Sequence, residues 1–543
     1  MTYAVSEPET IAIAMPDGAR LVADVYRPVG AGRVPVLLMR QPYGRKIAST
    51  VVLAHPVWYA AHGYIVMVQD VRGRGDSEGE FRLLVDDAAD GAATLAAAAD
   101  LAGCDGRVAT YGFSYQGITQ YLAFAGARAA RTIEPAAMAV VMAPWDIRNH
   151  WAYEGGAFRL QGGQMWAVQM AAENARLAGD TAAHHALRSA LGRLCGGFHP
   201  ARLDVLDAYP QYSHYADWLA DDPTYWAARS PSALLAGQRL ELPTFHVGGW
   251  LDIMLDGTFA AYQAFRAGGQ PSRLKVGPWP HLPWGRRAGG PDMGAAAGAG
   301  IDIDIVGFFD HVLKGAEPTA AVELFDLGTR RFVAFDRLPE GREASLFLAS
   351  NGRAAPTVTD GELVPEPGGA GTDRLVSDPW RPAPGFGLTL GTPGGYVDRA
   401  AVDDRGDVAV YTGAPLAADL TISGPIRAEI HVTSDRPSFD LAATLSVVAD
   451  DGSAMALAGG FTRVPAGATA GPVVVDLNRT MMTVAAGKRL RLSLAAAAWP
   501  AFMLNPGTGV RPEEATFADA QVTTLAIRHG AGAPSRLVFA CLE

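Results

Sequence analysis

A serine lies in a glycine-bracketed turn in the first quarter of the chain. The run Gly112-Phe113-Ser114-Tyr115-Gln116-Gly117 follows an apolar segment at 107–110 and precedes a helix-compatible stretch at 118–130. A strand, a sharp turn and a helix in this order lift a serine hydroxyl to the edge of a sheet, where it acts as a nucleophile. The second glycine comes one residue later than in the usual Gly-x-Ser-x-Gly pattern. Because an ordinary strand-to-helix turn fits the pattern equally well, the remaining catalytic groups must be sought elsewhere in the chain.

An acyl-transfer serine needs a histidine base and an acid that orients this base. The apolar run 245–251 ends at Asp252, and the next such run, 274–280, ends at His281. Ser114, Asp252 and His281 then follow one another in the order serine, acid, histidine, which is the order expected when each catalytic residue follows its own strand of an α/β sheet. The aspartate and the histidine each have an alternative interpretation. An aspartate after a strand is often a helix cap or a turn residue. His246 competes for the role of base, but it lies in the middle of a strand and is expected in the core.

The negative charge that develops on a carbonyl oxygen requires hydrogen-bond donors. The backbone N–H of Tyr115 is the first candidate, because it follows the nucleophile directly. The second donor must come from the loop after an early strand, where the sequence offers Arg40-Gln41-Pro42-Tyr43-Gly44. We expect the Tyr43 hydroxyl to fill this role, with a packed turn aromatic as the alternative.

The elements that must position these groups alternate between strand and helix in the first part of the chain. Residues 11–27 predict two strands around a Pro-Asp-Gly turn. The helix-length segments are 86–102 and 118–130, and the buried strands are expected at 34–39, 64–69, 107–113, 137–143, 242–248 and 273–277. This alternation predicts an α/β fold with a mostly parallel sheet covered on both faces.

Two changes of pattern divide the chain. Residues 146–235 carry Ala, Leu, His and Trp at helix-like spacing and no clear strands, which predicts a helical insertion. After residue 315, short alternating segments between Gly, Pro and Asp predict an all-β jelly roll or sandwich, with 351–397 as a long surface connection. The predicted domains are a first α/β part (1–145), a helical cap (146–235), a second α/β part (236–316) and a β jelly roll (317–543).

Composition excludes several function classes. The 543 residues carry a formal charge of −11 and no block of Lys and Arg, so neither nucleic acid nor an anionic membrane is an expected partner. The three cysteines, Cys104, Cys195 and Cys541, form neither a disulfide framework nor a metal-binding motif. We expect no metal and no cofactor. Because neither a signal peptide nor a membrane-spanning stretch is visible, the expected location is the cytoplasm.

The chain resembles the cocaine esterase group of hydrolases, which is related to the X-prolyl dipeptidyl aminopeptidases and the α-amino acid ester hydrolases. The resemblance rests on motifs that follow one another along nearly the whole chain: Arg40–Tyr43, Gln69–Gly79, Asp105–Val108, Gly112–Gly117, Gly249–Asp252, Gly277–His281, Phe308–Gly315, Asp407–Thr412 and Gly487–Leu492. It implies an α/β-hydrolase domain with an inserted helical cap and a C-terminal jelly roll. It also implies Ser114 as nucleophile, His281 as base, Asp252 as its partner, and Tyr43 and Tyr115 as the oxyanion hole.

The charged, glycine-rich run Asp70–Gly79 fits an ion-paired loop at the edge of the active site better than a phosphate cradle, because no Gly-Lys-Ser/Thr follows it. The pocket is expected to include Trp151 and Trp166 from the cap, whose rings offer large apolar contact, with Ile253 and Met254 as further wall residues.

The leading hypothesis is a cytoplasmic serine esterase that hydrolyses a small-molecule ester, or an amide, through an acyl-enzyme. The alternatives are an acyltransferase that uses the same acyl-enzyme, an X-prolyl dipeptidyl peptidase-like amide hydrolase, and a non-catalytic binding protein that uses the jelly roll. The jelly roll is also compatible with a homodimer.

Overall fold

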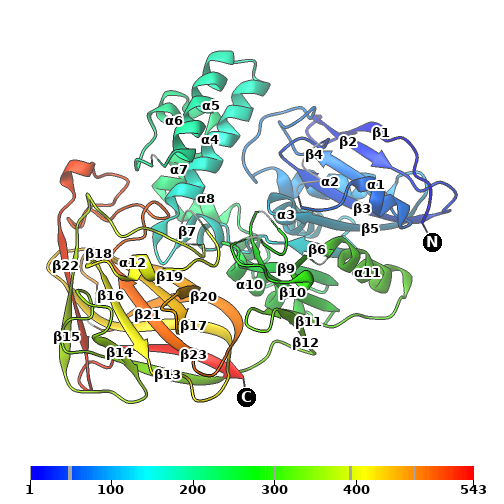
Figure 1. Ribbon diagram of the computed structural model, residues 1–543. Helices are drawn as coiled ribbons and strands as arrows, with labels where there is room; N and C mark the ends of the chain where they lie inside the picture. Colours follow the sequence, from blue (N-terminus) through cyan, green and yellow to red (C-terminus); the bar gives the residue numbers. More distant parts are fainter. Residues whose placement is uncertain are drawn as a thin grey trace.

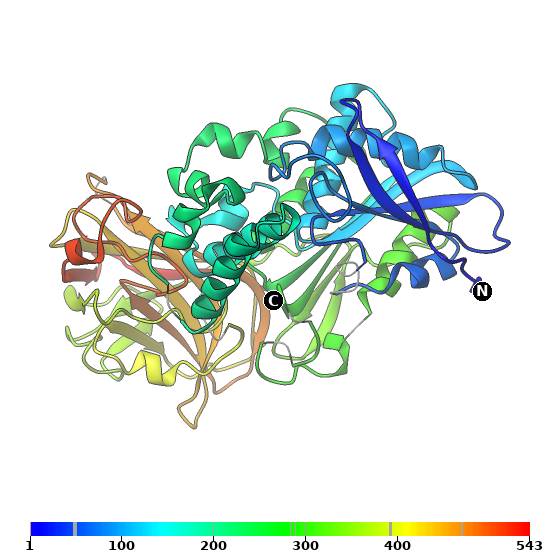
Figure 2. The ribbon, with the colours of Figure 1, turned by 90° about the horizontal axis from the view of Figure 1, so that it is seen from above.

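The computed structural model describes residues 2–46, 52–197, 199–282, 284–287, 289–298, 300–389, 394–468 and 471–542. Figure 1 shows an α/β part on the right, a group of helices at the top and an all-β part at the lower left. Seen from above, the helices lie over the junction between the other two parts (Figure 2).

The α/β part is built on a ten-stranded sheet in the order β1-β2-β4-β3-β5-β6-β9-β10-β11-β12. The strands from β4 to β11 run parallel, whereas β1, β2 and β12 pair in antiparallel fashion. Their bounds are β1 (Glu9–Ala14), β2 (Arg20–Tyr26), β3 (Val34–Gln41), β4 (Ile65–Asp70), β5 (Cys104–Phe113), β6 (Ala137–Val141), β9 (Thr244–Leu251), β10 (Ser272–Pro280), β11 (Val322–Asp326) and β12 (Arg331–Phe335).

Helices cover both faces of this sheet. Successive side chains of a strand point to opposite faces, and here both faces are apolar and must be buried. On β3, Leu37 and Met39 pack with one set of helices and Leu38 with the other. The first set is α1 (Pro56–Ala61) and α11 (Ile301–Lys314); the other face carries α2 (Asp87–Ala99), α3 (Tyr115–Ala130) and α10 (Leu255–Arg266). The predicted α/β-hydrolase architecture is thereby confirmed.

The segment between β6 and β9 is helical, as predicted, apart from a short hairpin of β7 (Tyr153–Glu154) and β8 (Ala157–Phe158). It contains α4 (Leu160–Leu177), α5 (Thr181–Cys195), α6 (Asp204–Ala208), α7 (Tyr215–Ala220), α8 (Pro223–Ala227) and α9 (Pro231–Leu234). A π-helix at Arg148–Ala152 precedes β7, and a 3-10 turn at Pro210–Tyr212 lies between α6 and α7. We refer to this segment as the cap.

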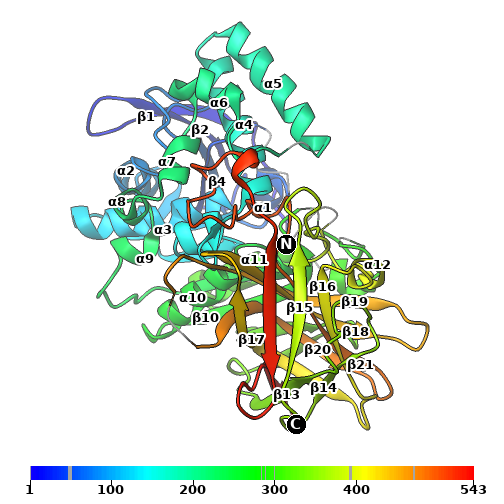
Figure 3. The same cartoon turned by 90° about the vertical axis from the view of Figure 1, so that its left-hand side faces the viewer.

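The C-terminal part is all-β, as predicted, and Figure 3 looks at it directly. Its described strands are β13 (Arg342–Ala349), β14 (Gly361–Val364), β15 (Gly371–Ser377), β16 (Val408–Gly413), β17 (Leu420–Ser434), β18 (Phe439–Val448), β19 (Ala454–Val464), β20 (Val473–Val484), β21 (Arg489–Ala495), β22 (Thr523–His529) and β23 (Arg536–Leu542). A short helix, α12 (Ala400–Asp403), and a 3-10 turn at Phe517–Asp519 accompany them. The strands β11 and β12, although they follow residue 316, extend the α/β sheet instead.

The prediction of a surface connection over 351–397 is wrong in part. The segment contains β14, which pairs with β13 and β16, and β15, which pairs with β22. The many glycines of this segment made it look like a loop in the sequence. At Gly371, however, glycine is required by packing within a strand, because a Cβ there would lie 2.2 Å from the ring of His529. Residues 390–393 lie outside the described residues.

None of the described helices combines the length and the apolar character needed to cross a bilayer.

Candidate active site

Ser114 stands at the sharp turn between β5 and α3 in a strained conformation. Its φ is +60° and its ψ is −121°, a combination that L-residues rarely adopt. The turn projects the serine from the carboxyl end of the sheet, as expected for a nucleophile elbow.

The displaced glycine of the elbow has a packing explanation. At the position of the usual second glycine stands Gln116, whose Oε1 accepts a hydrogen bond from the backbone N–H of Phe113 at 3.0 Å. Gly112 must then be a glycine, because its Cβ would lie 2.5 Å from the Cβ of Gln116. Gly117 faces β6 instead, where an added Cβ would lie 2.6 Å from that of Ala143. The shifted pattern therefore keeps the turn tight and brings α3 close to the sheet.

The structure brings Ser114, His281 and Asp252 together in one hydrogen-bonded chain. The distance from His281 Nε2 to Ser114 Oγ is 3.0 Å, and that from His281 Nδ1 to Asp252 Oδ1 is 2.8 Å. Asp252 is fully buried, whereas the His281 side chain is 26% exposed. Because a carboxylate can only accept, Nδ1 donates to Asp252 and Nε2 is left to accept the serine proton.

An irregularity in β10 places His281 beside Asp252. The register between β9 and β10 shifts between Gly277 and Pro280, directly before the histidine. Such bulges re-aim the side chain that follows them. The ring of Phe113 lies 4.6 Å from the imidazole, and Trp284 Nε1 donates to the His281 carbonyl oxygen at 3.0 Å. These contacts hold the imidazole towards the serine.

The rings of Tyr43 and Tyr115 lie edge to face with centroids 6.5 Å apart, and both residues line the same cavity as Ser114. The Tyr115 N–H belongs to the first turn of α3, where backbone donors have no partner within the helix and the dipole favours negative charge. The Tyr115 hydroxyl donates to Asp87 Oδ2 at 2.8 Å, which anchors the residue. The Tyr43 hydroxyl accepts a hydrogen bond from Trp166 Nε1 at 3.3 Å. Burial raises the pKa of Tyr43, so its hydroxyl stays a neutral donor at neutral pH.

A cavity of about 840 Å³ opens over these groups between the sheet and the cap. All the residues expected in the pocket line it, together with Ser114 and His281: Trp151, Trp166, Ile253 and Met254. The Trp151 and Trp166 rings meet edge to face with centroids 5.1 Å apart. Asp252 lies behind the histidine and does not line the cavity.

Sequence reasoning missed other residues of this wall. Leu83 and Leu84 line it from a loop in which both have positive φ values. A leucine in the sequence does not indicate such a backbone conformation, so this loop could not be predicted. Phe158, Arg159 and Met165 come from the cap. Thr389 and Ala501 belong to the C-terminal part, and no local pattern relates them to Ser114.

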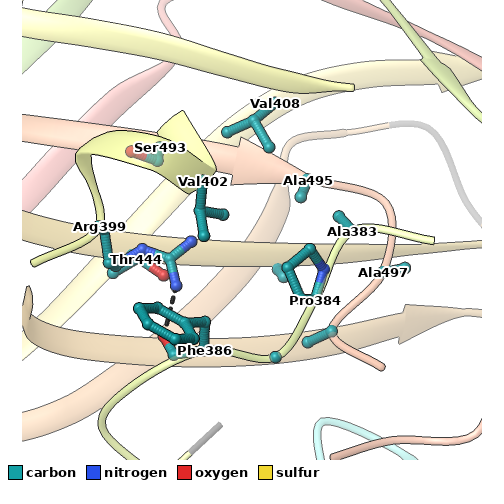
Figure 4. Close-up of a pocket in the computed structure, with 13 residues that line it drawn as sticks. Ala383, Pro384, Phe386, Arg399, Val402, Val408, Thr444, Ser493, Ala495 and Ala497 are labelled. Carbon is teal, nitrogen blue, oxygen red and sulfur yellow. Dashed lines mark hydrogen bonds between the residues drawn. The ribbon is translucent and has the colours of Figure 1, made fainter. Parts of the chain in front are cut away.

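A second hollow in the C-terminal part is too small for a substrate. Figure 4 shows Ala383, Pro384, Phe386 and Arg399 around it, with Arg399 Nη1 donating to the Phe386 carbonyl oxygen at 2.6 Å. Its volume of about 10 Å³ has room for about one water molecule.

Two family models match the chain. Residues 17–283 match the X-Pro dipeptidyl-peptidase (S15 family), and residues 314–538 match the X-Pro dipeptidyl-peptidase C-terminal non-catalytic domain. The chain is similar to a cocaine esterase from Rhodococcus sp. (strain MB1 Bresler), with 29% identity over 539 residues and 92% of each chain covered.

Solved structures share the fold along the whole chain. An aminopeptidase from a marine sediment Thaumarchaeota archaeon matches with a TM-score of 0.80 and 20% identity, covering 99% of this chain and 96% of its own. An α-amino acid ester hydrolase matches with a TM-score of 0.78 and 20% identity, covering 100% and 97%. A CocE/NonD family hydrolase from Staphylococcus aureus matches at 0.68 and 16%, covering 99% and 93%.

Proposed function

The chain belongs to the cocaine esterase-like hydrolases and carries both domains of the S15 family, and on this premise we propose that it hydrolyses small-molecule carboxylic esters through an acyl-enzyme on Ser114. The observation that carries the proposal is the hydrogen-bonded chain from Ser114 through His281 to Asp252, at the wall of a large cavity.

In the acylation step, Ser114 Oγ attacks the ester carbonyl carbon while His281 Nε2 takes the hydroxyl proton. Asp252 stabilises the imidazolium that forms. The carbonyl oxygen becomes an oxyanion, for which the Tyr43 hydroxyl and the Tyr115 N–H are the donors. When the tetrahedral intermediate collapses, the bond to the alcohol oxygen breaks and the alcohol leaves with the proton from His281.

In the deacylation step, His281 removes a proton from a water molecule that attacks the acyl carbon. The same two donors stabilise the second oxyanion. Its collapse breaks the bond to Ser114 Oγ, which regains its proton from His281, and the carboxylic acid is released. No step requires a metal or a cofactor.

The wall of the cavity supports an ester with an apolar acyl or alcohol group. Trp151, Trp166, Ile253 and Met254 offer apolar contact at this wall. No Asp or Glu is among its described lining residues. Because a buried ammonium needs a paired acid, this wall favours esters over peptides or amino esters with a free amino group.

The test is a series of 4-nitrophenyl esters of graded acyl length, assayed with the wild type and with Ser114→Ala. We expect hydrolysis by the wild type and a loss of at least about a thousandfold in the variant. As a matched control, Ser345→Ala changes a serine on β13, in the C-terminal part, and should leave turnover unchanged. Undiminished hydrolysis by Ser114→Ala would remove Ser114 from the reaction.

A further inference from the structure

The loop after β4 buries an arginine that the mechanism does not use. Arg74 has no exposed surface, and its Nε and Nη1 atoms have no hydrogen-bond partner among the described residues. Its guanidinium carbon lies 3.9 Å above the centre of the Phe81 ring, and Nη2 lies 3.9 Å from Met170 Sδ. No carboxylate of the described residues lies within 4.0 Å of it; Glu173 on α4, which pairs with Arg176, acts on it only from further away. A buried cation without a partner carries a large desolvation cost, so its presence calls for an explanation.

The loop is built to turn this side chain inwards. Gly73 and Gly75 flank Arg74 and have φ values of +66° and +56°. A Cβ on Gly73 would lie 2.3 Å from the backbone N of Phe81, and one on Gly75 would lie 2.0 Å from the Asp70 carboxylate. The other charges between Asp70 and Gly79 are paired: Asp70 and Asp76 with Arg45 at 2.7 Å each, and Arg72 with Asp90 and Glu78 with Arg20 at 2.6 Å each. Arg74 therefore stands out as the unpaired charge of an otherwise ion-paired loop.

Two series of contacts connect Arg74 to Tyr43 and to the ring of Tyr115. Met170, which it contacts, is one helical turn along α4 from Trp166, so the two side chains share one face of the helix. Trp166 in turn donates to the Tyr43 hydroxyl. On the other side, the Phe81 ring under the guanidinium lies 6.1 Å from the Tyr115 ring, which lies 6.5 Å from that of Tyr43.

From this geometry we infer that Arg74 is a positioning residue for catalysis: its unpaired buried charge stabilises the oxyanion that forms at Tyr43 and Tyr115 without touching the substrate. The inference rests on the proposed ester hydrolysis. In a poorly screened interior, a fixed charge acts across several ångströms, and an environment oriented in advance stabilises the transition state selectively.

The pKa values of Arg74 and Tyr43 agree with what this inference requires. Burial lowers the pKa of Arg74 to about 10, which still leaves the guanidinium charged at neutral pH. Burial raises the pKa of Tyr43, and the positive charge of Arg74 opposes this rise. The same charge therefore favours negative charge at the hole.

The experiment separates binding of the charged tetrahedral state from binding of a neutral ligand. Ser114 Oγ adds to the boron of butylboronic acid while His281 Nε2 takes the hydroxyl proton, which gives a tetrahedral boronate anion, whereas butyramide binds as a neutral carbonyl compound. For Arg74→Met we expect the inhibition constant of butylboronic acid to rise, and kcat/KM for an ester to fall, by the same factor of roughly tenfold to hundredfold. The inhibition constant of butyramide should change by less than about twofold, and Arg74→Lys should recover most of the loss.

A second pair of variants leaves the arginine in place and covers the case in which Arg74→Met does not fold. Met170→Glu puts a carboxylate beside the guanidinium and neutralises it, while Met170→Gln changes the same position without charge. The glutamate should reproduce the selective loss and the glutamine should not. Arg273→Met is a further control, because this buried arginine is paired with Asp304 and Glu323 at the other end of β10.

Two results would overturn the inference and leave Arg74 a structural role. One is that Arg74→Met loses affinity for butylboronic acid and for butyramide by the same factor; the other is that Met170→Glu and Met170→Gln lose affinity for the boronic acid equally. A wild type that neither hydrolyses esters nor binds the boronate would contradict the proposed function itself, so the two failures are distinguishable.

Discussion

At the scale of single residues, the proposed reaction depends on where each hydrogen-bond donor and acceptor points. Asp252 holds His281 Nδ1, which leaves Nε2 for the serine. Trp166 donates to the Tyr43 hydroxyl oxygen, so the hydroxyl proton is free to point towards an oxyanion. The residues around the serine thus divide between moving a proton and stabilising charge.

Removing the Tyr43 hydroxyl should slow the reaction without unfolding the protein. Tyr43→Phe deletes one oxyanion donor, which lowers kcat by about 100- to 1000-fold while KM changes little. Tyr396→Phe is the matched control, because it removes another buried hydroxyl, one that has no hydrogen-bond partner among the described residues. Steady-state kinetics of both variants decide the matter, and near-normal turnover of Tyr43→Phe would exclude the hydroxyl from the oxyanion hole.

At the scale of the elements, the sheet delivers the three groups because parallel strands end at the same edge. Ser114, Asp252 and His281 directly follow β5, β9 and β10. The sequence predicts these positions, since each of the three residues follows an apolar run. The strand β15 could not be predicted in this way, because Gly371 is dictated by the His529 ring, which lies more than 150 residues further along the chain.

The close approach of α3 to β6 can be tested at Gly117. In Gly117→Ala the new methyl would lie 2.6 Å from Ala143 Cβ and 3.1 Å from Val140 Cγ1, in a buried place. We expect a loss of stability of about 1–3 kcal/mol, together with lower activity as the elbow moves. Gly192→Ala in α5 meets nothing within 4 Å and should stabilise its helix by up to about 1 kcal/mol. Thermal unfolding compares the two, and equal melting temperatures would contradict the packing argument.

The buried histidine of β9 should make stability depend on pH. Burial lowers the pKa of His246 to about 3, so below about pH 6.5 the unfolded chain binds a proton that the folded chain does not. Stability should therefore fall as the pH drops from about 6.5 towards 3. In His246→Phe the decrease in melting temperature between pH 7 and pH 5 should be smaller than in the wild type. The exposed His185 provides the control, since His185→Phe should leave the decrease unchanged.

At the scale of the whole molecule, the C-terminal part completes the cavity. The first N–H groups of α4 have no side-chain cap, and two of them donate to C-terminal carbonyl oxygens instead: Leu160 to Ala501 at 2.8 Å and Gln161 to Pro500 at 3.2 Å. Ala501 and Thr389 also line the cavity. Sequence patterns predict the β strands of this part but not these contacts, because each joins residues that are distant in the chain and chemically unremarkable.

The seam between cap and C-terminal part can be tested with two adjacent glycines. Both Gly155 and Gly156 have positive φ, so alanine causes similar backbone strain at either position. Only at Gly155 would the new Cβ also collide with the C-terminal part, 2.0 Å from the Phe461 carbonyl oxygen; at Gly156 nothing lies within 4 Å. Gly155→Ala should therefore raise KM and lower the melting temperature more than Gly156→Ala. Identical kinetics would mean that this seam does not shape the cavity.

Intact-mass labelling with a fluorophosphonate tests most directly whether Ser114 is an activated nucleophile. Phosphonylation replaces fluoride at phosphorus by Ser114 Oγ, so the wild type should gain the mass of one adduct. Folded Ser114→Ala should gain none. An adduct of equal yield on Ser114→Ala, or no adduct on folded wild type, would contradict the account.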